Sequence, residues 1–361
     1  MAKERLPIAK HMSTKVKKQK NLFFLIISLS FLASVLIAWK IIYNFYSETK
    51  REAPNFALGI LPLPKINGFK TREKNILYNF QNVSKESENL PKIIKVYKFK
   101  RKEIKKEEAE EIAAKFGFNF PPEEKFTSST PSAFLYFQWK EKNQQLNISP
   151  LGEISYKYFP EDYSELKNPS FLASEEEAVK IVKEKIASLG FLENKTLLFK
   201  PFVNYIVLGP SEYHLASKKE ETNGFEISLQ PQIENIPILE NNPESSFFSA
   251  LLGNLNTIIS LEANLFEVDF TLSGTYPLKN FQEVRNDLAS GKGQVVYLEK
   301  IKYPLESQQE ISISQVNIAR INLAYFFDRE NFYLYPIYVL SGIFNIEGEG
   351  NTAGIIYLYA L

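Results

Sequence analysis

The sequence predicts an α+β protein with a single N-terminal transmembrane helix followed by two or three antiparallel-sheet units, each with a short amphipathic helix. Three observations predict this class. An uncharged apolar run over residues 22–39 is close to the length that crosses the hydrocarbon core of a bilayer. Helical and strand periodicities alternate along the rest of the 361-residue chain. Aromatic residues make up 14 % of the chain, and they favour strands.

The transmembrane helix is expected over residues 21–46, with the lipid bilayer as its partner. Seven basic residues and one acidic residue precede Asn21, and those nearest the span are Lys15, Lys17, Lys18 and Lys20. Short basic flanks stay in the cytoplasm, so we expect a single-pass protein of the cell membrane with its main domain extracytoplasmic. No small-residue cleavage site follows the apolar run, so the segment is expected to remain as an anchor.

Three small residues in this span, Ser30, Ser34 and Ala38, are spaced four apart and therefore share one stripe of a helix. Such a stripe lets a second membrane helix approach closely. The alternative is chance, because Ser and Ala are common in membrane spans. The stripe is a candidate contact with a membrane partner.

Charge and cysteine content exclude several functions. The chain carries a net charge of +1, and the basic residues before Asn21 leave the remainder at −5. An acidic exterior argues against a nucleic-acid partner. The chain has no Cys, which excludes disulfides, a thiolate nucleophile and Cys-based metal sites. The sequence indicates no cofactor.

The expected organisation follows composition and periodicity. A basic cytoplasmic tail occupies residues 1–20, the transmembrane helix 21–46, a Pro-containing stalk or wrap over the first unit 47–91, and three α+β units 92–170, 171–275 and 276–361. Amphipathic helices are expected over residues 105–118, 174–190 and 277–291. The first two helices both begin EEA and end GF, which predicts a degenerate internal repeat.

Strands are expected wherever the apolar pattern alternates. They cover residues 93–100, 133–139, 144–148, 153–158, 197–208, 224–230, 264–272, 294–302, 310–325, 332–343 and 353–360. In the strand over 264–272, Phe266, Val268, Phe270 and Leu272 are expected to face the core. The apolar phase shifts twice along 310–325, and each shift predicts a bulge or bend.

The C-terminal half resembles a known family. The segments YPLKNFQEVRNDLASGKG, QVVYLEKIKY, NIARINLAYFFD and FYLYPIYVLSGIF follow one another in the order of the extracytoplasmic domains of YycH/YycI-type regulators, which have PepSY-like repeated α+β units. The likeness covers roughly residues 174–361. It implies a membrane-tethered partner of a sensor histidine kinase and no catalysis. The family has no active-site motif to carry over to this chain.

Few residues offer catalytic or metal-binding chemistry. His11 lies in the expected inner tail and His214 on the outer side, so the membrane would separate them and a surface role is expected for each. Glu267 and Asp269 share a strand face, as paired carboxylates of a hydrolase would, but any half-solvated strand shows the same alternation. No metal site is expected, and the acidic residues Glu347 and Glu349 are expected in a solvated hairpin loop.

The aromatic runs over residues 134–139 and 325–338 could form a stacking surface for glycan or peptide. Alternation places Phe137 and Trp139 on one face and Phe134 and Tyr136 on the other, so we expect a core covered on both sides. The sequence therefore predicts a noncatalytic envelope protein whose outer domains bind a membrane or envelope protein, with a sensor kinase as candidate partner. The alternatives are a cell-wall scaffold or binding protein and, least favoured, a carboxylate-dependent hydrolase.

Overall fold

The computed structural model describes residues 32–40, 53–72, 76–81, 83, 90–126, 135–160, 172, 174–191, 196–209, 212–301 and 310–361. The chain divides into two compact units, Met1–Ala53 and Pro54–Leu361. In the first unit, residues 32–40 are helical and exposed, and the rest of the predicted span over 21–46 lies outside the described residues. Among the described residues, no helix is long and apolar enough to cross a membrane. The membrane span therefore stays a prediction.

The second unit is a mixed α+β structure made mostly of strands, which confirms the predicted fold class at this level. Its helices are α2 (Lys106–Ala114), α3 (Glu175–Ser188) and α4 (Phe281–Ala289). Each helix buries residues at helical spacing, such as Ala178, Val182 and Ile186 of α3. Ser174 caps α3 by accepting a hydrogen bond from the Glu177 backbone N–H, and Gly190 follows its end with a positive φ.

One antiparallel sheet, here called the N-terminal sheet, has the order β4-β5-β6-β7-β13-β12-β10-β8-β9 among the described strands. In chain order these are β4 (Glu123–Phe126), β5 (Leu135–Lys140), β6 (Gln144–Ile148), β7 (Glu153–Tyr158), β8 (Leu197–Leu208), β9 (Tyr213–Leu215), β10 (Gly224–Ile233), β12 (Phe248–Leu252) and β13 (Ile258–Asn264).

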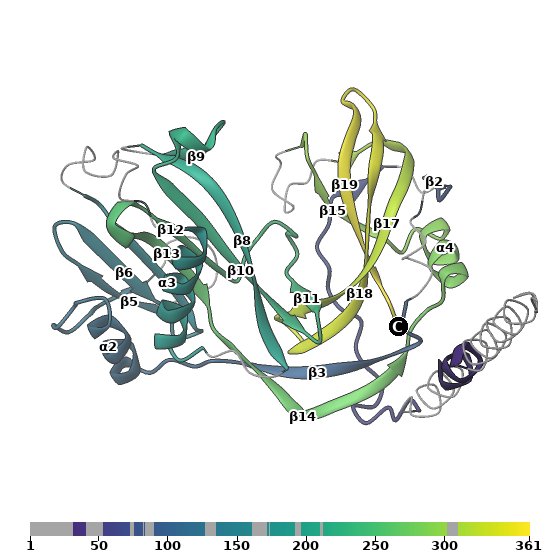
Figure 1. Cartoon of the computed structure of the whole chain (residues 1–361), viewed down its shortest axis with the longest axis horizontal. Helices are drawn as coiled ribbons and strands as arrows, with labels where there is room; N and C mark the ends of the chain where they lie inside the picture. The colour runs from purple at the N-terminus through teal and green to yellow at the C-terminus, as the bar shows by residue number, and fades with distance from the viewer. Residues whose placement is uncertain are drawn as a thin grey trace, which may run out of the picture. The chain divides into compact units, whose positions relative to one another are not determined.

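The N-terminal sheet is built from two segments with the same element order. Helix α2 is followed by β4, β5, β6 and β7, and helix α3 by β8, β10, β12 and β13; each set of four strands pairs in succession. This shared order agrees with the internal repeat that the sequence predicts. The two sets join edge to edge where β7 pairs with β13, and α2 and α3 lie on one face of the sheet (Figure 1).

The second sheet, here called the C-terminal sheet, centres on β17 (Ile313–Asp328), β18 (Tyr333–Ile346) and β19 (Gly350–Tyr359), with β15 (Gln294–Leu298) beside β19. The short strands β2 (Leu77–Asn79) and β11 (Ile236–Leu239) pair in parallel with β17. A further small pair joins β1 (Lys70–Thr71) to β16 (Glu310–Ile311). Register shifts in β17 after Ile313 and after Ile318 confirm the two predicted irregularities.

Two connections join the sheets. Strands β3 (Ile93–Arg101) and β14 (Phe266–Pro277) form a long antiparallel ribbon, and β3 also pairs with the start of β18 (Figure 1). Strand β11 pairs with β10 at one end and with β17 at the other.

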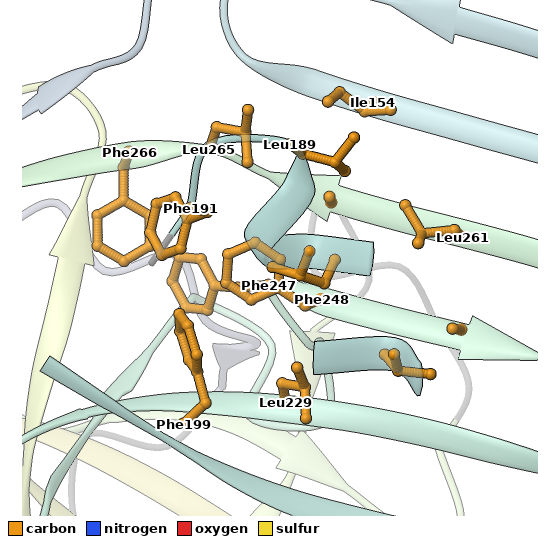
Figure 2. Packing of buried hydrophobic residues seen from close by; sticks show 14 of the residues in the cluster. Ile154, Leu189, Phe191, Phe199, Leu229, Phe247, Phe248, Leu261, Leu265 and Phe266 are labelled. Atoms are coloured by element: carbon orange, nitrogen blue, oxygen red, sulfur yellow. The ribbon is translucent and has the colours of Figure 1, made fainter. Parts of the chain in front are cut away.

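Phenylalanines from several elements pack where these connections meet (Figure 2). Phe191 and Phe248 lie 4.9 Å apart between ring centroids, and Phe266 of β14 lies 5.2 Å from Phe191 and 4.8 Å from Phe327 of β17. Phe327 in turn stacks on Phe99 of β3 at 3.9 Å. Because these rings come from both sheets and from the β3–β14 ribbon, the hydrophobic core is continuous across the junction.

The predicted strand over 264–272 differs from the structure. Strand β13 ends at Asn264 and β14 begins at Phe266, and the pairing of β14 with β3 shifts between Asp269 and Ser273. Asp269 Oδ1 accepts hydrogen bonds from the backbone N–H groups of Thr271 and Leu272, which holds the irregular turn. Leu272, expected in the core, is therefore 47 % exposed.

The start of the third helix also differs from the prediction. Pro277 ends β14 rather than opening α4, which begins at Phe281 after the N-cap Asn280. Asn280 and Glu283 form a capping box that satisfies the first backbone donors of the helix. Proline has no backbone N–H to donate to a neighbouring strand, so it is tolerated at the end of a strand as well as in the first turn of a helix.

The expected wrap does not cover the first α+β unit where the structure describes it. Residues 54–69, here called the strap, contact strands β14 and β15 instead. Asn55 exchanges two hydrogen bonds of 2.9 Å with Thr275 of β14, and the Phe69 backbone N–H donates to the Val295 carbonyl of β15 at 2.7 Å. Thr275 of β14 and the edge of β15 supply these partners, which the sequence did not reveal.

Helices α2 and α3 exchange hydrogen bonds at their C-terminal ends. Lys115 Nζ donates to the Ser188 carbonyl at 2.6 Å, and Lys185 Nζ donates to the Lys115 carbonyl at 2.7 Å. Lys185 Nζ also lies 3.7 Å from the centroid of the Phe116 ring. Cations at helix C-termini satisfy the last carbonyls and interact favourably with the helix dipoles. Burial and the neighbouring Lys115 charge lower the pKa of Lys185 to about 8.

This exchange predicts a pH-dependent stability. Because the pKa of Lys185 is lower in the folded chain than its ordinary 10.5, the unfolded chain binds more protons between these values, and stability rises with pH there. We expect Lys185→Met to remove this contribution, so that the free energy of unfolding in urea rises less from pH 7.5 to about 9.5 than in the native chain. Lys180→Met, on the exposed side of α3, is the control. An unchanged slope in Lys185→Met would contradict the assignment.

Candidate binding pocket

The helix-free face of the N-terminal sheet carries polar side chains at the junction of its two repeats. Along β7, Ile154 and Tyr156 are buried on the helix side, and Ser155 between them faces the opposite way. Glu262 of β13 lies directly across from Ser155, and the Ser155 hydroxyl donates to Glu262 Oε1 at 2.8 Å. The centre of the duplicated sheet thus presents a carboxylate on its open face.

A cavity of about 650 Å³ lies over this pair. Its volume is within the range of ligand-binding pockets, roughly 300–1,000 Å³. Strands β5, β6, β7 and β13 supply most of its wall, and two arginines come from the ends of β3 and β17. The lining residues are Arg101, Leu135, Tyr136, Asn147, Ser149, Leu151, Glu153, Ile154, Ser155, Glu262, Ala263, Asn264 and Arg329. The pocket therefore needs both sheets in place.

Arg329 is held by two carboxylates. Its Nη1 lies 3.0 Å from Glu153 Oε1, and its Nη2 donates to Glu240 Oε1. Burial lowers the pKa of the Arg329 guanidinium, but Glu240 and Glu153 outweigh burial, so the pKa is raised overall. Glu240 follows β11 and Glu153 begins β7, so this cluster fastens the C-terminal sheet to the N-terminal sheet at the pocket's edge.

Arg101 has a different environment. Its Nη2 donates to the Arg329 carbonyl at 3.1 Å, and its guanidinium carbon lies 5.7 Å from the centroid of the Phe332 ring. Arg329 forms ion pairs with Glu153 and Glu240. Among the described side chains, no carboxylate forms an ion pair with Arg101. Its remaining donors can therefore bind an anionic or carbonyl group in the pocket.

Glu262 is the complementary charge. Desolvation by the surrounding protein raises its pKa, although the hydrogen bond from Ser155 and the charge of Lys157 act in the opposite direction. The carboxylate is partly exposed in the cavity, where a cationic or hydrogen-bond-donating group would stabilise its charged form. Neither Arg101 nor Glu262 forms an ion pair with another described side chain. The pocket therefore has one positive and one negative group that can pair with a ligand.

Amide groups hold the rest of the wall in place. Asn147 Oδ1 accepts from Gln138 Nε2 at 2.9 Å and from Gln145 Nε2 at 3.3 Å, and Ser149 Oγ accepts from the Leu151 backbone N–H at 3.1 Å. Tyr136, expected to be covered like its neighbours, instead lines the cavity, because the face opposite the helices is open there. Phe137 and Trp139 are buried as expected.

The residues singled out from the sequence do not meet in this pocket. Ser34 and Ala38 lie on the exposed helix over residues 32–40, while Ser30, Lys15, Lys17, Lys18, Lys20 and His11 lie outside the described residues. His214 is exposed in β9, where it pairs with Val207 of β8. Among the described residues, no group of three or more His, Asp or Glu could hold a metal ion.

The acidic pairs have local roles. The hydrogen bond from the Thr271 side chain, with those from the Thr271 and Leu272 backbone, lowers the pKa of Asp269, although desolvation acts in the opposite direction. Asp269 thus stabilises the turn in β14. Glu347 and Glu349 lie exposed in the turn between β18 and β19, as predicted.

Sequence reasoning missed Arg101, Glu153, Glu262 and Arg329. Each is a charged residue near the end of a strand or on the open side of one, a pattern that every half-solvated sheet shows. Their grouping depends on the pairing of β7 with β13 and on the pairing of β17 with β11, which are long-range contacts.

No family model, curated protein or solved structure matches the chain with significance.

The raised pKa of Glu262 predicts the pH dependence of a substitution. The pKa of Glu262 is higher in the folded chain than its ordinary value of 4.5 in the unfolded chain. As the pH rises through the range between these two values, the unfolded chain loses this proton first, so the free energy of unfolding falls. We expect Glu262→Gln to gain stability relative to the native chain between pH 4 and 7, measured by urea unfolding. Glu267→Gln, exposed on β14, is the matched control. A difference that stays constant with pH would contradict the prediction for Glu262.

Proposed function

We propose that the chain is a noncatalytic single-pass membrane protein whose extracytoplasmic domain binds a protein partner through the pocket at the junction of the two sheets. The observation that carries this proposal is the open cavity in which Arg101 and Glu262 present opposite charges. The proposed membrane anchor is the segment 21–46, of which residues 32–40 form the described helix.

The mixed lining of the cavity favours a peptide segment as ligand. A peptide presents backbone N–H and carbonyl groups together with side chains of either charge, which match the amide, hydroxyl, guanidinium and carboxylate groups of the wall. The clamp of Arg329 between Glu153 and Glu240 fixes the wall before binding, so little ordering cost is expected there.

The partner to test first is a sensor histidine kinase, because the YycH/YycI resemblance of residues 174–361 implies one. The alternative is that the chain is a cell-wall scaffold or binding protein. Its ligand would then bind in the same pocket, where Tyr136 offers an aromatic ring beside polar groups. Identification of the captured protein separates the two, and both depend on the pocket.

The proposal predicts which surface contacts the partner. A photo-crosslinking amino acid in place of Tyr136, introduced into the full chain in intact membranes, is expected to capture one protein that mass spectrometry identifies. The same group in place of Lys180, exposed on α3, is expected not to capture that protein.

Charge reversal in the pocket provides the matched test. We expect Glu262→Lys or Arg101→Glu to lower capture by about tenfold or more, the loss expected for about 1.4 kcal/mol of binding free energy. Glu184→Lys, exposed on α3, should leave capture unchanged. Equal capture by the native chain and by both pocket variants, with folding verified by circular dichroism, would rule out the pocket as the contact.

A further inference from the structure

We infer that the strap rests on the surface of a lipid bilayer, with the side chains of Phe56, Ile60 and Leu63 inserted among the headgroups. This inference rests on the proposed membrane anchoring and goes beyond it, because it assigns a second membrane contact to the folded domain itself. The strap would set how the domain stands on the membrane.

The strap is fixed to the domain along its inner side. The Tyr276 hydroxyl donates to the Gly59 carbonyl at 2.9 Å, and the Phe56 and Tyr276 rings meet edge to face at 5.4 Å. Leu61 and Ile66 pack against a buried cluster of the C-terminal sheet, and Phe69 is itself buried. These contacts hold the backbone in one path and divide its side chains into inner and outer sets.

Two glycines allow this close seating. A Cβ on Gly274 of β14 would lie 3.1 Å from the backbone nitrogens of Ala57 and Leu58, and a Cβ on Gly68 would lie 2.8 Å from the Val295 carbonyl oxygen. The strap backbone therefore lies directly against the domain at both of its ends. An element seated in this way presents its outer side chains in a defined direction.

The outer side chains are apolar and open to solvent. Ile60 is fully exposed and Leu63 is 76 % exposed, and Phe56 remains 52 % exposed although its ring also contacts Tyr276. These three side chains fall within eight consecutive residues of the strap. Clustered exposed apolar side chains on a fixed segment indicate a binding surface.

Position and composition favour a bilayer as the occupant. Residues 41–53 connect the helix over residues 32–40 to the strap. Fully extended, this connection would place the end of the helix at most about 50 Å from the start of the strap. The strap has no acidic residue, and its one charged side chain, Lys65, pairs with Glu330 of the domain at 2.9 Å. The strap therefore presents apolar side chains with no unpaired charge, which suits the apolar boundary of a bilayer.

The absence of Cys from the chain allows a direct test with single introduced cysteines. The full chain is reconstituted into vesicles of phosphatidylcholine and phosphatidylglycerol that contain a brominated lipid. An environment-sensitive fluorophore is attached to Ile60→Cys, Leu63→Cys, Leu36→Cys in the helix, or Leu215→Cys. Leu215, 63 % exposed in β9, is the control for an exposed apolar site away from the strap.

We expect quenching at positions 60, 63 and 36 and little quenching at 215. Quenching at 36 without quenching at 60 and 63 would overturn the strap contact while leaving the anchor intact. Quenching at 60 and 63 without quenching at 36 would support the strap contact and overturn the proposed anchor. Quenching at none of these three positions, or equally at 215, would overturn the strap contact.

Discussion

The antiparallel pairing of β7 with β13 joins the two repeats, and the arrangement of the whole domain depends on it. Each repeat has a helix and four strands, and each would expose its last strand as an unpaired edge. Pairing the two edges removes both, places α2 and α3 on one face, and brings Ser155 opposite Glu262 on the other. The reciprocal hydrogen bonds of Lys115 and Lys185 reinforce the same contact from the helix side.

The C-terminal sheet completes the pocket. The β3–β14 ribbon and β11 connect it to the N-terminal sheet, and the packed rings of Phe99, Phe266 and Phe327 fill the junction. Arg101 and Arg329 enter the pocket from this side, so recognition by the pocket depends on the relative position of the two sheets. A protein partner that binds there would also stabilise their packing.

Local patterns in the sequence predict much of the fold. The helices at α2 and α3, the strands at β6, β7 and β8, and both irregularities in β17 follow from periodicity and turn residues. Strands β12 and β13 were missed because short apolar runs such as FSALL do not show whether they form a strand or a helix. The turn from β10 to β11 uses Glu234 and Asn235 with positive φ, without the Asn-Gly signal of such turns. The pocket could not be predicted, since its charges converge only through long-range pairing.

The pairing of β7 with β13 is tested most directly by disulfide formation in the otherwise cysteine-free chain. Lys157 and Ser260 are direct cross-strand partners, so Lys157→Cys with Ser260→Cys is expected to oxidise readily under mild conditions. Lys157→Cys with Asn264→Cys, four residues out of register, is expected to stay reduced. Oxidation of the second pair in preference to the first, or of neither pair in a folded chain, would contradict the joined sheet on which the pocket depends.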